Sequence, residues 1–270
     1  MSGDTLVARV APPLLSGGRR AGRILERNLL VYRRTWMIVF SGFAEPVFYL
    51  FAVGVGIGQL VGDVVGPDGT AVSYPEFVAP ALLAASAMNG AVFESTFNIF
   101  FKLRFARTYD AVLATPMQPN DIAIGEVSWS LLRGGLYAVG FLVVAAALGL
   151  IRSPLALLAL PAALLIGFAF AAVGMAASTF MRSWQDFDLV TLVTLPLFLF
   201  SATFYPIDVY PAAIQPLIRL SPLYHSVEIV RAMMLGVVDV SLVGHLAFLL
   251  AMGAVGVVVS ARRFSRILRA

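Results

Sequence analysis

Cysteine is absent from this chain, histidine occurs twice, and lysine occurs once, at Lys102. Without cysteine the chain has neither a disulfide framework nor thiolate chemistry. The sequence contains no H-E-x-x-H zinc pair and no G-x-x-x-x-G-K-[ST] phosphate-binding loop, which excludes ATP hydrolysis by the P-loop route. We also find none of the carboxylate or histidine clusters that membrane proteases and prenyl-transfer enzymes need. We therefore expect no catalytic residue, no metal site and no bound cofactor, and we do not expect an enzyme.

Charge is also scarce, since charged residues make up 13% of the chain and hydrophobic residues 60%. Soluble domains contain about 25% charged residues, and a soluble globule of this size could not bury so much apolar surface. A helix of about 20 apolar residues crosses the ~30 Å hydrocarbon layer. Six stretches have that length, and they predict an all-α integral membrane protein. The predicted spans are Trp36–Val61, Phe77–Phe101, Ile122–Ile151, Pro154–Met181, Phe187–Tyr205 and Leu242–Ser260.

A further apolar region, Pro206–Ser241, is interrupted by Pro211, Pro216 and Pro222. Each proline removes a backbone donor and ends or kinks a helix, so the intervening pieces are too short to span. We predict short re-entrant helices between the fifth and sixth spans, which dip into the outer leaflet and return.

Basic residues gather on one side of the predicted spans. Most of the 19 lie in the N-terminal segment, in the connections after the second and fourth spans, and in the tail. The first loop on the opposite side has Asp63, Asp68 and Glu76 and no basic residue. Because basic residues concentrate on the cytoplasmic face, we expect both termini in the cytoplasm. The arginines flank spans and form no patch on a folded domain, so we expect the lipid bilayer and no nucleic acid as a partner.

The chain divides into three predicted parts: a cytoplasmic N-terminal segment (1–35), a six-helix membrane domain (36–261) and a basic cytoplasmic tail (262–270). We expect no signal peptide. At 100° per residue, Arg19–Arg34 places Leu25, Leu29 and Tyr32 on one face and several arginines on another. This pattern indicates an amphipathic helix at the level of the lipid headgroups. A disordered basic arm is the alternative.

Glycines in the first span repeat at Gly54, Gly58 and Gly62. The spacing of every fourth residue lets a neighbouring helix approach closely. We prefer this packing interpretation to a dinucleotide-binding fingerprint, because Gly56 belongs to a membrane helix and the third glycine of the fingerprint is misplaced.

Five polar residues fall inside predicted spans, where a charge is expensive and is usually paired or functional. They are Glu45, Asn89, Glu94, Glu126 and Arg133. Helical rise places Glu94 and Arg133 at similar depths, so we expect them to pair, with Glu45 as the alternative partner. The pair either holds helices together or takes part in gating or substrate passage. Glu126 lies near the cytoplasmic interface, where we expect it to reach water or cap the helix start.

The connection after the second span resembles the cytoplasmic loop of the ABC-2 type exporter permeases. Its matching residues are Thr108–Pro116 (TYDAVLATP) and Gly125-Glu126, and Ser221–Arg231 (SPLYHSVEIVR) resembles the family's second signature. Within the family the chain is most similar to the nodulation-factor, or lipo-oligosaccharide, export permeases, which are close to the daunorubicin-resistance permeases. The residues that carry this closer resemblance are Tyr74 to Phe77, Ala79-Pro80, Ser86 to Met88 and Phe93 to Ser95, whereas Phe204-Tyr205-Pro206 departs from the usual Phe-Phe-Pro.

This resemblance implies a division of labour. A separate cytoplasmic ATP-binding-cassette ATPase, in two copies, would bind ATP and Mg²⁺, and a second permease subunit, expected to be an identical copy, would complete the path. The loop would form a coupling helix that docks on the ATPase, with Tyr109, Val112 and Leu113 as its apolar contact and Pro116 at its end. A solvated loop is the alternative. The expected coupling residues are Tyr109, Asp110, Val112, Leu113, Thr115 and Pro116.

The resemblance also suggests a route across the membrane. The region after the fifth span would close the outer end, with His225, Glu228 and Arg231 as a polar gate or as a cluster that stabilises a bent loop. The first, second and fifth spans would line the path, and Phe198, Phe200 and Phe204 would lie near it or face lipid.

The expected function is therefore that of an exporter permease in a bacterial plasma (inner) membrane. Its substrate would be amphipathic or lipid-linked: a lipo-oligosaccharide, a glycolipid or a hydrophobic drug, the last implying efflux and antibiotic resistance. The alternatives are an ATP-independent secondary transporter, which usually needs inverted repeats and charged midplane sites, and a membrane assembly factor without transport activity.

Overall fold

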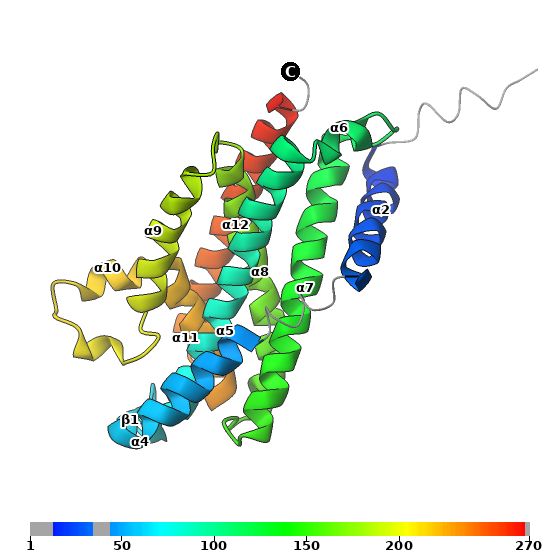
Figure 1. Cartoon of the computed structure of the whole chain (residues 1–270). Helices are drawn as coiled ribbons and strands as arrows, with labels where there is room; N and C mark the ends of the chain where they lie inside the picture. Colours follow the sequence, from blue (N-terminus) through cyan, green and yellow to red (C-terminus); the bar gives the residue numbers. More distant parts are fainter. Residues whose placement is uncertain (1–12, 35–43, 268–270) are drawn as a thin grey trace, which may run out of the picture.

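The structure is a computed structural model, and it describes residues 13–34 and 44–267. The expected start of the first span (36–43) and the last three residues of the basic tail lie outside the described residues. Most of what is described is helix (Figure 1). Five helical segments are long and apolar enough to cross a membrane. They are Ala44–Val61, Tyr74–Phe105, Asp121–Ala147, Pro154–Ser178 and Ser241–Arg263.

These segments comprise shorter elements. The first contains η1 (Leu50–Ile57) and α4 (Gly58–Val61), and the second begins with α5 (Tyr74–Phe93) and continues as η2 (Glu94–Asn98) and η3 (Phe101–Phe105). The third lies in α7 (Pro119–Ala147), the fourth joins η4 (Pro154–Leu158) to α8 (Ala159–Ser178), and the fifth lies in α12 (Ser241–Ile267). The segment η2 is a π-helix, a form that is frequent at functional sites.

The expected fifth span, Phe187–Tyr205, is wrong in its length. The helix there, α9 (Asp186–Leu199), has 14 residues, and at 1.5 Å per residue it covers about 21 Å of the ~30 Å hydrocarbon layer. Pro196 lies in its last turn, and Ala202 beyond it has a left-handed φ of 54°. The backbone therefore leaves the helical path before the apolar sequence ends, and five of the described helices, not six, have spanning length.

Short helices fill the proline-interrupted region, as the prolines predict. They are η5 (Ile207–Val209), α10 (Gln215–Arg219) and α11 (Pro222–Leu235). Helix α11 begins with Pro222 in its first turn, and Ser221 caps it by accepting a hydrogen bond from the Tyr224 N–H. Its buried residues join the core formed with α5, α8 and α12. That these helices dip into a membrane leaflet stays a prediction.

A small hairpin that the sequence analysis missed lies at one end of the bundle (Figure 1). Its strands β1 (Asp63–Val65) and β2 (Ala71–Ser73) are antiparallel, with Val64 opposite Val72. Gly69 in the turn has a φ of 78°, a conformation that glycine adopts without strain. At the same end Arg152 makes an ion pair with Glu76, and its hydrogen bonds to Glu76 raise the pKa of Arg152 above its ordinary value.

Small residues allow close helix packing in the core. A Cβ added at Gly256 of α12 would lie 2.8 Å from the backbone of Ala172 in α8, and one at Gly253 would lie 2.7 Å from the Phe168 ring. In the first segment, Gly54 and Gly58 lie against Pro75 of α5, as the packing interpretation of these glycines predicts. Gly62 does not share that role, because it ends α4 with a φ of 74°.

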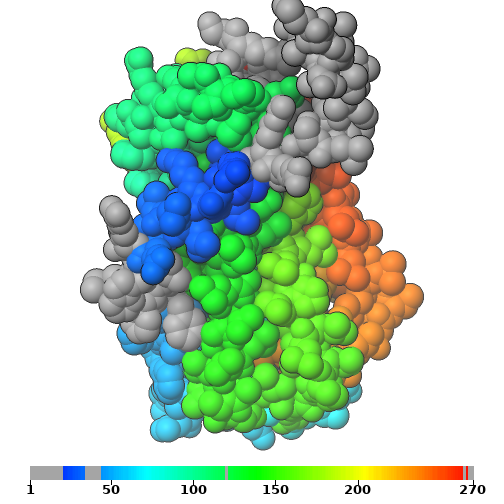
Figure 2. Space-filling model, turned by 90° about the vertical axis from the view of Figure 1, so that its right-hand side faces the viewer, coloured from blue at the N-terminus to red at the C-terminus, as the bar shows by residue number. Residues whose placement is uncertain are grey.

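A helix is present where the amphipathic segment predicts one, and it begins earlier, at Pro13. This helix, α2 (Pro13–Arg34), lies against the outside of α7 (Figures 1 and 2). The side chains that it buries there are Ala21, Ile24 and Asn28, whereas Leu29 is 56% exposed. Of the Leu25, Leu29 and Tyr32 face that the sequence pattern suggests, Tyr32 therefore contacts α7, where its ring lies 4.9 Å from that of Trp129, whereas Leu29 faces away.

Candidate functional site

The expected intramembrane ion pair is present. Arg133 Nη1 of α7 lies 2.6 Å from Glu94 Oε2 of η2, and the Glu94 side chain is only 4% exposed. A carboxylate in so apolar a setting is stable only if it is paired and hydrogen-bonded. Asn98, one turn further along η2, donates a second hydrogen bond to Glu94. Glu45, the alternative partner, lines the same cavity as Arg133.

Two tyrosines complete the surroundings of Arg133. Its Nε donates to the Tyr137 hydroxyl at 2.6 Å, and its Nη1 donates to the Tyr32 hydroxyl of α2 at 3.1 Å. The guanidinium also lies over both rings, 5.1 Å from the centroid of Tyr32 and 5.4 Å from that of Tyr137. The pair therefore connects α2, η2 and α7 in one polar network.

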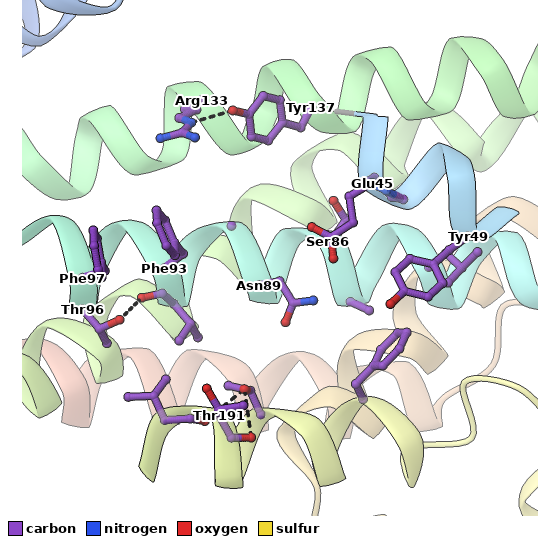
Figure 3. Close-up of a pocket in the computed structure, with 18 of the residues that line it drawn as sticks. Glu45, Tyr49, Ser86, Asn89, Phe93, Thr96, Phe97, Arg133, Tyr137 and Thr191 are labelled. Atoms are coloured by element: carbon purple, nitrogen blue, oxygen red, sulfur yellow. Dashed lines mark hydrogen bonds between the residues drawn. The ribbon is translucent and has the colours of Figure 1, made fainter. Parts of the chain in front are cut away.

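Beside this network is a cavity of about 670 Å³. Its walls come from the 44–61 segment, α5 with η2, α7 and α9 (Figure 3). Asn89 of α5 points into the space between α5 and α9, where Thr191 stands opposite (Figure 3). The polar residues that line it include Glu45, Ser86, Asn89, Thr96, Arg133, Thr191 and Thr194.

Aromatic rings form the rest of the cavity wall. Phe93 and Phe97 stack with centroids 5.0 Å apart, and Phe97 lies 5.4 Å from Phe187 of α9. At the other end of the cavity Phe198 lies 5.7 Å from Tyr49, edge to face. Rings beside amide, hydroxyl and carboxylate groups suit a ligand that has both apolar faces and hydroxyl groups.

The three phenylalanines expected near the path lie in different environments. Phe198 lines the cavity and contacts Phe204 behind it, with centroids 5.2 Å apart. Phe200 is 50% exposed and is not among the residues that line the cavity.

A second buried cluster surrounds Glu126, and here the sequence analysis was wrong. Glu126 is 3% exposed, so it does not reach water, and α7 begins at Pro119 with a capping box between Gln118 and Asp121. Its carboxylate accepts hydrogen bonds from three side chains on three other segments. The donors are Lys102 Nζ of η3 at 2.7 Å, Asn28 Nδ2 of α2 at 3.2 Å and the Tyr109 hydroxyl at 3.2 Å.

Tyr109 belongs to α6 (Thr108–Leu113), which is where the coupling helix is expected. Its side chain is 1% exposed and packs with Ile99 and Ile122, so it supplies no exposed apolar contact. Burial raises the pKa of Tyr109 well above its usual range, and the nearby Glu126 raises it further, so the hydroxyl stays a neutral donor.

The large apolar side chains of α6 point inward. Val112 and Leu113 pack partly buried against the cluster around Tyr109. The exposed surface is formed by Asp110, Ala111, Ala114, Thr115 and Pro116. Docking through Tyr109 therefore conflicts with its burial, Val112 and Leu113 are partly accessible, and Asp110, Thr115 and Pro116 are exposed.

The expected outer gate splits into two parts. Arg231 is 2% exposed and makes an ion pair with Glu228 at 2.7 Å, donates to the Ala202 carbonyl at 2.8 Å, and lies 3.9 Å from the Phe77 ring centroid. His225 is not part of this cluster. Its Nδ1 lies 2.7 Å from Nδ1 of His245 in α12. Arg231 thus fixes the turn after α9, and His225 joins α11 to α12.

Comparison with known proteins identifies the family. Residues 21–235 match the ABC-2 type transporter family. This chain belongs to the ABC-2 type transporter family. The match includes α6, both buried clusters and α11. The residues of the Glu126 cluster, of the Glu94–Arg133 pair and of the cavity beside that pair therefore all lie within the matched region.

Relatives of this permease cover most of its length. It is 37% identical over 244 residues to "Nodulation protein J" of Rhizobium leguminosarum bv. trifolii, with 89% of each chain covered. It is 35% identical to proteins of the same name from Rhizobium leguminosarum bv. viciae (83% of this chain, 85% of that one) and Rhizobium meliloti (79% and 80%).

Sequence reasoning missed several partners in the polar clusters. Lys102 is the only lysine in the chain, and that rarity beside a buried glutamate could have identified it as the partner of Glu126. Asn28 and Tyr32 lie four residues apart on α2 and reach the two clusters separately. Among the residues that the structure describes, no group of three or more His, Asp or Glu side chains could hold a metal ion.

Proposed function

We propose that this permease is the membrane-spanning subunit of an ATP-driven exporter in the bacterial plasma membrane. A separate ATP-binding-cassette ATPase, present in two copies, would bind ATP and Mg²⁺ and dock on α6, and a second copy of this chain would complete the path. The observation that carries the proposal is the link from α6 to the membrane helices, in which the Tyr109 hydroxyl contacts Glu126, buried between α2, η3 and α7.

The orientation in the membrane follows from the basic residues at the end of the molecule that carries α6. Helix α6 and the C-terminal end of α12 lie at one end of the bundle, opposite the hairpin (Figure 1). Arg104, Arg107 and Arg266 belong to that end, and basic residues favour the cytoplasmic face. We therefore place α6 and both termini in the cytoplasm, with the hairpin and α10 outside.

The cargo would be amphipathic, and a lipo-oligosaccharide fits best. The cavity combines stacked rings with Asn89, Thr191 and Glu45, whereas the charges of Glu94 and Arg133 neutralise one another. A sugar-bearing lipid uses rings and hydrogen-bonding groups, and the Glu45 carboxylate, which lines the cavity outside that pair, can accept hydrogen bonds from sugar hydroxyls. The relatives named "Nodulation protein J" support this class.

ATP binding and hydrolysis would move α6, and the buried hydrogen bonds would transmit that movement. Because a helix packed on a dry core shifts as a unit, displacement of Tyr109 would displace Glu126 and the α7 helix that carries it. Helix α7 also carries Arg133, seven residues further on, which reaches the cavity wall.

The test is reconstitution with a candidate cytoplasmic ATP-binding-cassette ATPase. Ala114→Glu changes the exposed side of α6, and Ala212→Glu makes the same change at an exposed residue in the loop before α10. We expect the first variant to lose ATPase co-purification and substrate-stimulated ATP hydrolysis and the second to retain both. Transport of cargo by vesicles that contain the permease alone would overturn the proposal.

A further inference from the structure

A second cavity, of about 910 Å³, lies on the other side of α9. Its walls come from α8, α9 and α12 together with part of the second helical segment, and almost all of its lining is apolar. Representative lining residues are Phe170, Val173, Leu189, Val193, Leu197 and Met252. It has no amide counterpart to Asn89, and the carboxylate in its lining, Asp186, lies beside Arg182 and Ser183 at one end.

The residues of α9 separate into three faces. Phe187, Thr191 and Phe198 line the first cavity, and Leu189, Val193 and Leu197 line the second. The third face contains Leu192, Leu195 and Leu199, which are not among the lining residues of either cavity. The spacings of three, four and seven residues are those of single faces of an α-helix.

The two cavities meet along a common border. Val92 and Thr96 on one side and Val190 and Thr194 on the other line both of them. None of the 14 described residues of α9 is buried, so this helix is not locked into the bundle by its side chains. A ligand that occupies both cavities would therefore pass between η2 and α9, where small displacements of α9 open the way.

We propose that the second cavity takes the hydrocarbon chain of a single-chain amphiphile whose polar head occupies the first cavity. The inference rests on the proposed export function and adds a binding site to it. The head would contact Asn89 and Thr191, and the chain would cross the border beside Thr194 and end among Phe170, Val173 and Met252.

One end of the second cavity is lined by polar residues, Arg182, Ser183 and Asp186. Asp186 accepts hydrogen bonds from the backbone N–H groups of Arg182, at 2.6 Å, and Ser183, at 3.0 Å. Because these groups bond to each other, they offer a polar wall and no further ligand contact. This polar end therefore does not suit a hydrocarbon chain, which would stay among the apolar lining residues.

Selection of the substrate must come from the head. A chain that moves from the bilayer into an apolar cavity gains no hydrophobic free energy, because lipid tails are equally apolar. The second cavity would thus host any chain, and only contacts in the first cavity retain the correct one. Occupancy of the second cavity by the substrate chain must therefore depend on residues that line the first.

This dependence is the test. The full permease–ATPase complex in nanodiscs is exposed to a lipo-oligosaccharide whose single acyl chain has a photoreactive diazirine at its terminal carbon. We expect labelling of α8 and α12 around Phe170 and Met252. Asn89→Leu should lower that labelling about fivefold, the effect of one lost hydrogen bond. A diazirine phospholipid in the same discs should label equally with and without the substitution.

A matched pair of variants tests the chain site directly. Leu189→Trp fills the second cavity, and Leu192→Trp adds the same ring on the third face; Leu189 is 61% exposed and Leu192 67%. We expect Leu189→Trp to abolish labelling of α8 and α12 by the glycolipid and Leu192→Trp to leave it unchanged. The Asn89 experiment leaves the second cavity itself unaltered, so it tests the inference even if Leu189→Trp misfolds.

The possible outcomes separate the two proposals. Labelling of the third face as strong as that of α8, or labelling of α8 that ignores Asn89→Leu, would mean ordinary bilayer lipid and would overturn the chain site. If the glycolipid stimulates ATP hydrolysis without labelling α8 or α12, the chain site fails and the exporter stands. If it neither labels the complex nor stimulates hydrolysis, the proposed export of such lipids fails.

Discussion

Lys102 Nζ lies 2.7 Å from Glu126 Oε2 in a site where both side chains are at most 10% exposed. The two residues come from the end of the second helical segment and from α7. An ion pair removed from water is stable only while both partners and their hydrogen bonds remain, since either charge alone would be buried without compensation.

Glu126→Leu should therefore destabilise the permease by about 3–5 kcal/mol. Replacing both residues, as Glu126→Leu with Lys102→Met, should restore most of that loss, because a buried ion pair and a packed apolar pair are often similar in stability. Chemical denaturation in mixed micelles measures the free energy of unfolding. A single variant as stable as the unmodified chain would contradict the burial of this pair.

The Glu94–Arg133 pair makes a parallel prediction that also separates its two possible roles. Arg133→Met should cost about 3–5 kcal/mol, because Glu94 stays buried. Glu94→Leu with Arg133→Met should recover the stability. If this double variant also retains substrate-stimulated ATP hydrolysis, the pair only holds helices together; if hydrolysis no longer responds to substrate, the pair acts in transport.

Charge reversal is the control for that experiment. Glu94→Arg combined with Arg133→Glu keeps one charge of each sign, and a glutamate at 133 could accept from the hydroxyls of Tyr32 and Tyr137. We expect the reversed pair to be more stable than either single reversal. A reversed pair as unstable as the single variants would count against the pairing.

Close packing of α2 on α7 predicts a large difference between two glycines of the same helix. A Cβ at Gly125 would lie 2.6 Å from the Cβ of Ile24 and 3.0 Å from the Ala21 carbonyl, whereas one at Gly134 would have no neighbour within 4 Å. Gly125→Ala should therefore cost about 1–3 kcal/mol and loosen α2. Gly134→Ala should be neutral or stabilising by up to about 1 kcal/mol. The rate at which a protease cleaves α2 in the folded permease measures this loosening. Equal cleavage rates in the two variants would refute the contact.

The contacts of Arg231 predict how much its loss destabilises the turn after α9. Arg231→Met removes the ion pair to Glu228 and the donor to the Ala202 carbonyl, and Glu228 can still reach solvent. We expect a loss of about 2–3 kcal/mol. Arg219→Met, at an exposed arginine on α10, should change stability by less than about 0.5 kcal/mol. Similar losses for the two variants would exclude a special role for Arg231.

The helical pattern of this permease could be read from its sequence because the bilayer imposes it. Long apolar runs predict the starts of α7 and α12 and the end of α8 within three residues, since unsatisfied backbone groups in lipid force a helix, although α12 continues seven residues past its predicted end. The depth argument for Glu94 and Arg133 succeeded for the same reason, because rise per residue converts sequence distance into position along the membrane normal. Local chemistry likewise predicted the short helices between Pro206 and Ser241.

The predictions from sequence fail where contacts between segments distant in the chain determine the structure. The apolar run after Phe187 continues to Tyr205, yet α9 ends at Leu199, and Arg231 from a helix far along the chain holds the turn at Ala202. Tyr109 was expected to face a partner and instead enters the protein, where Glu126 receives its hydroxyl. Apolar composition does not tell whether a side chain faces its own core or another protein.

The sequence by itself determined that this chain resides in a membrane, which stretches form helices, and which polar residues lie at equal depth, because these properties depend on each residue and the bilayer. The tertiary structure alone decided that Glu126 is a buried junction of α2, η3, α6 and α7, and that α9 separates a polar cavity from an apolar one. Those features arise from packing between helices distant in the chain, and no local pattern encodes which faces meet.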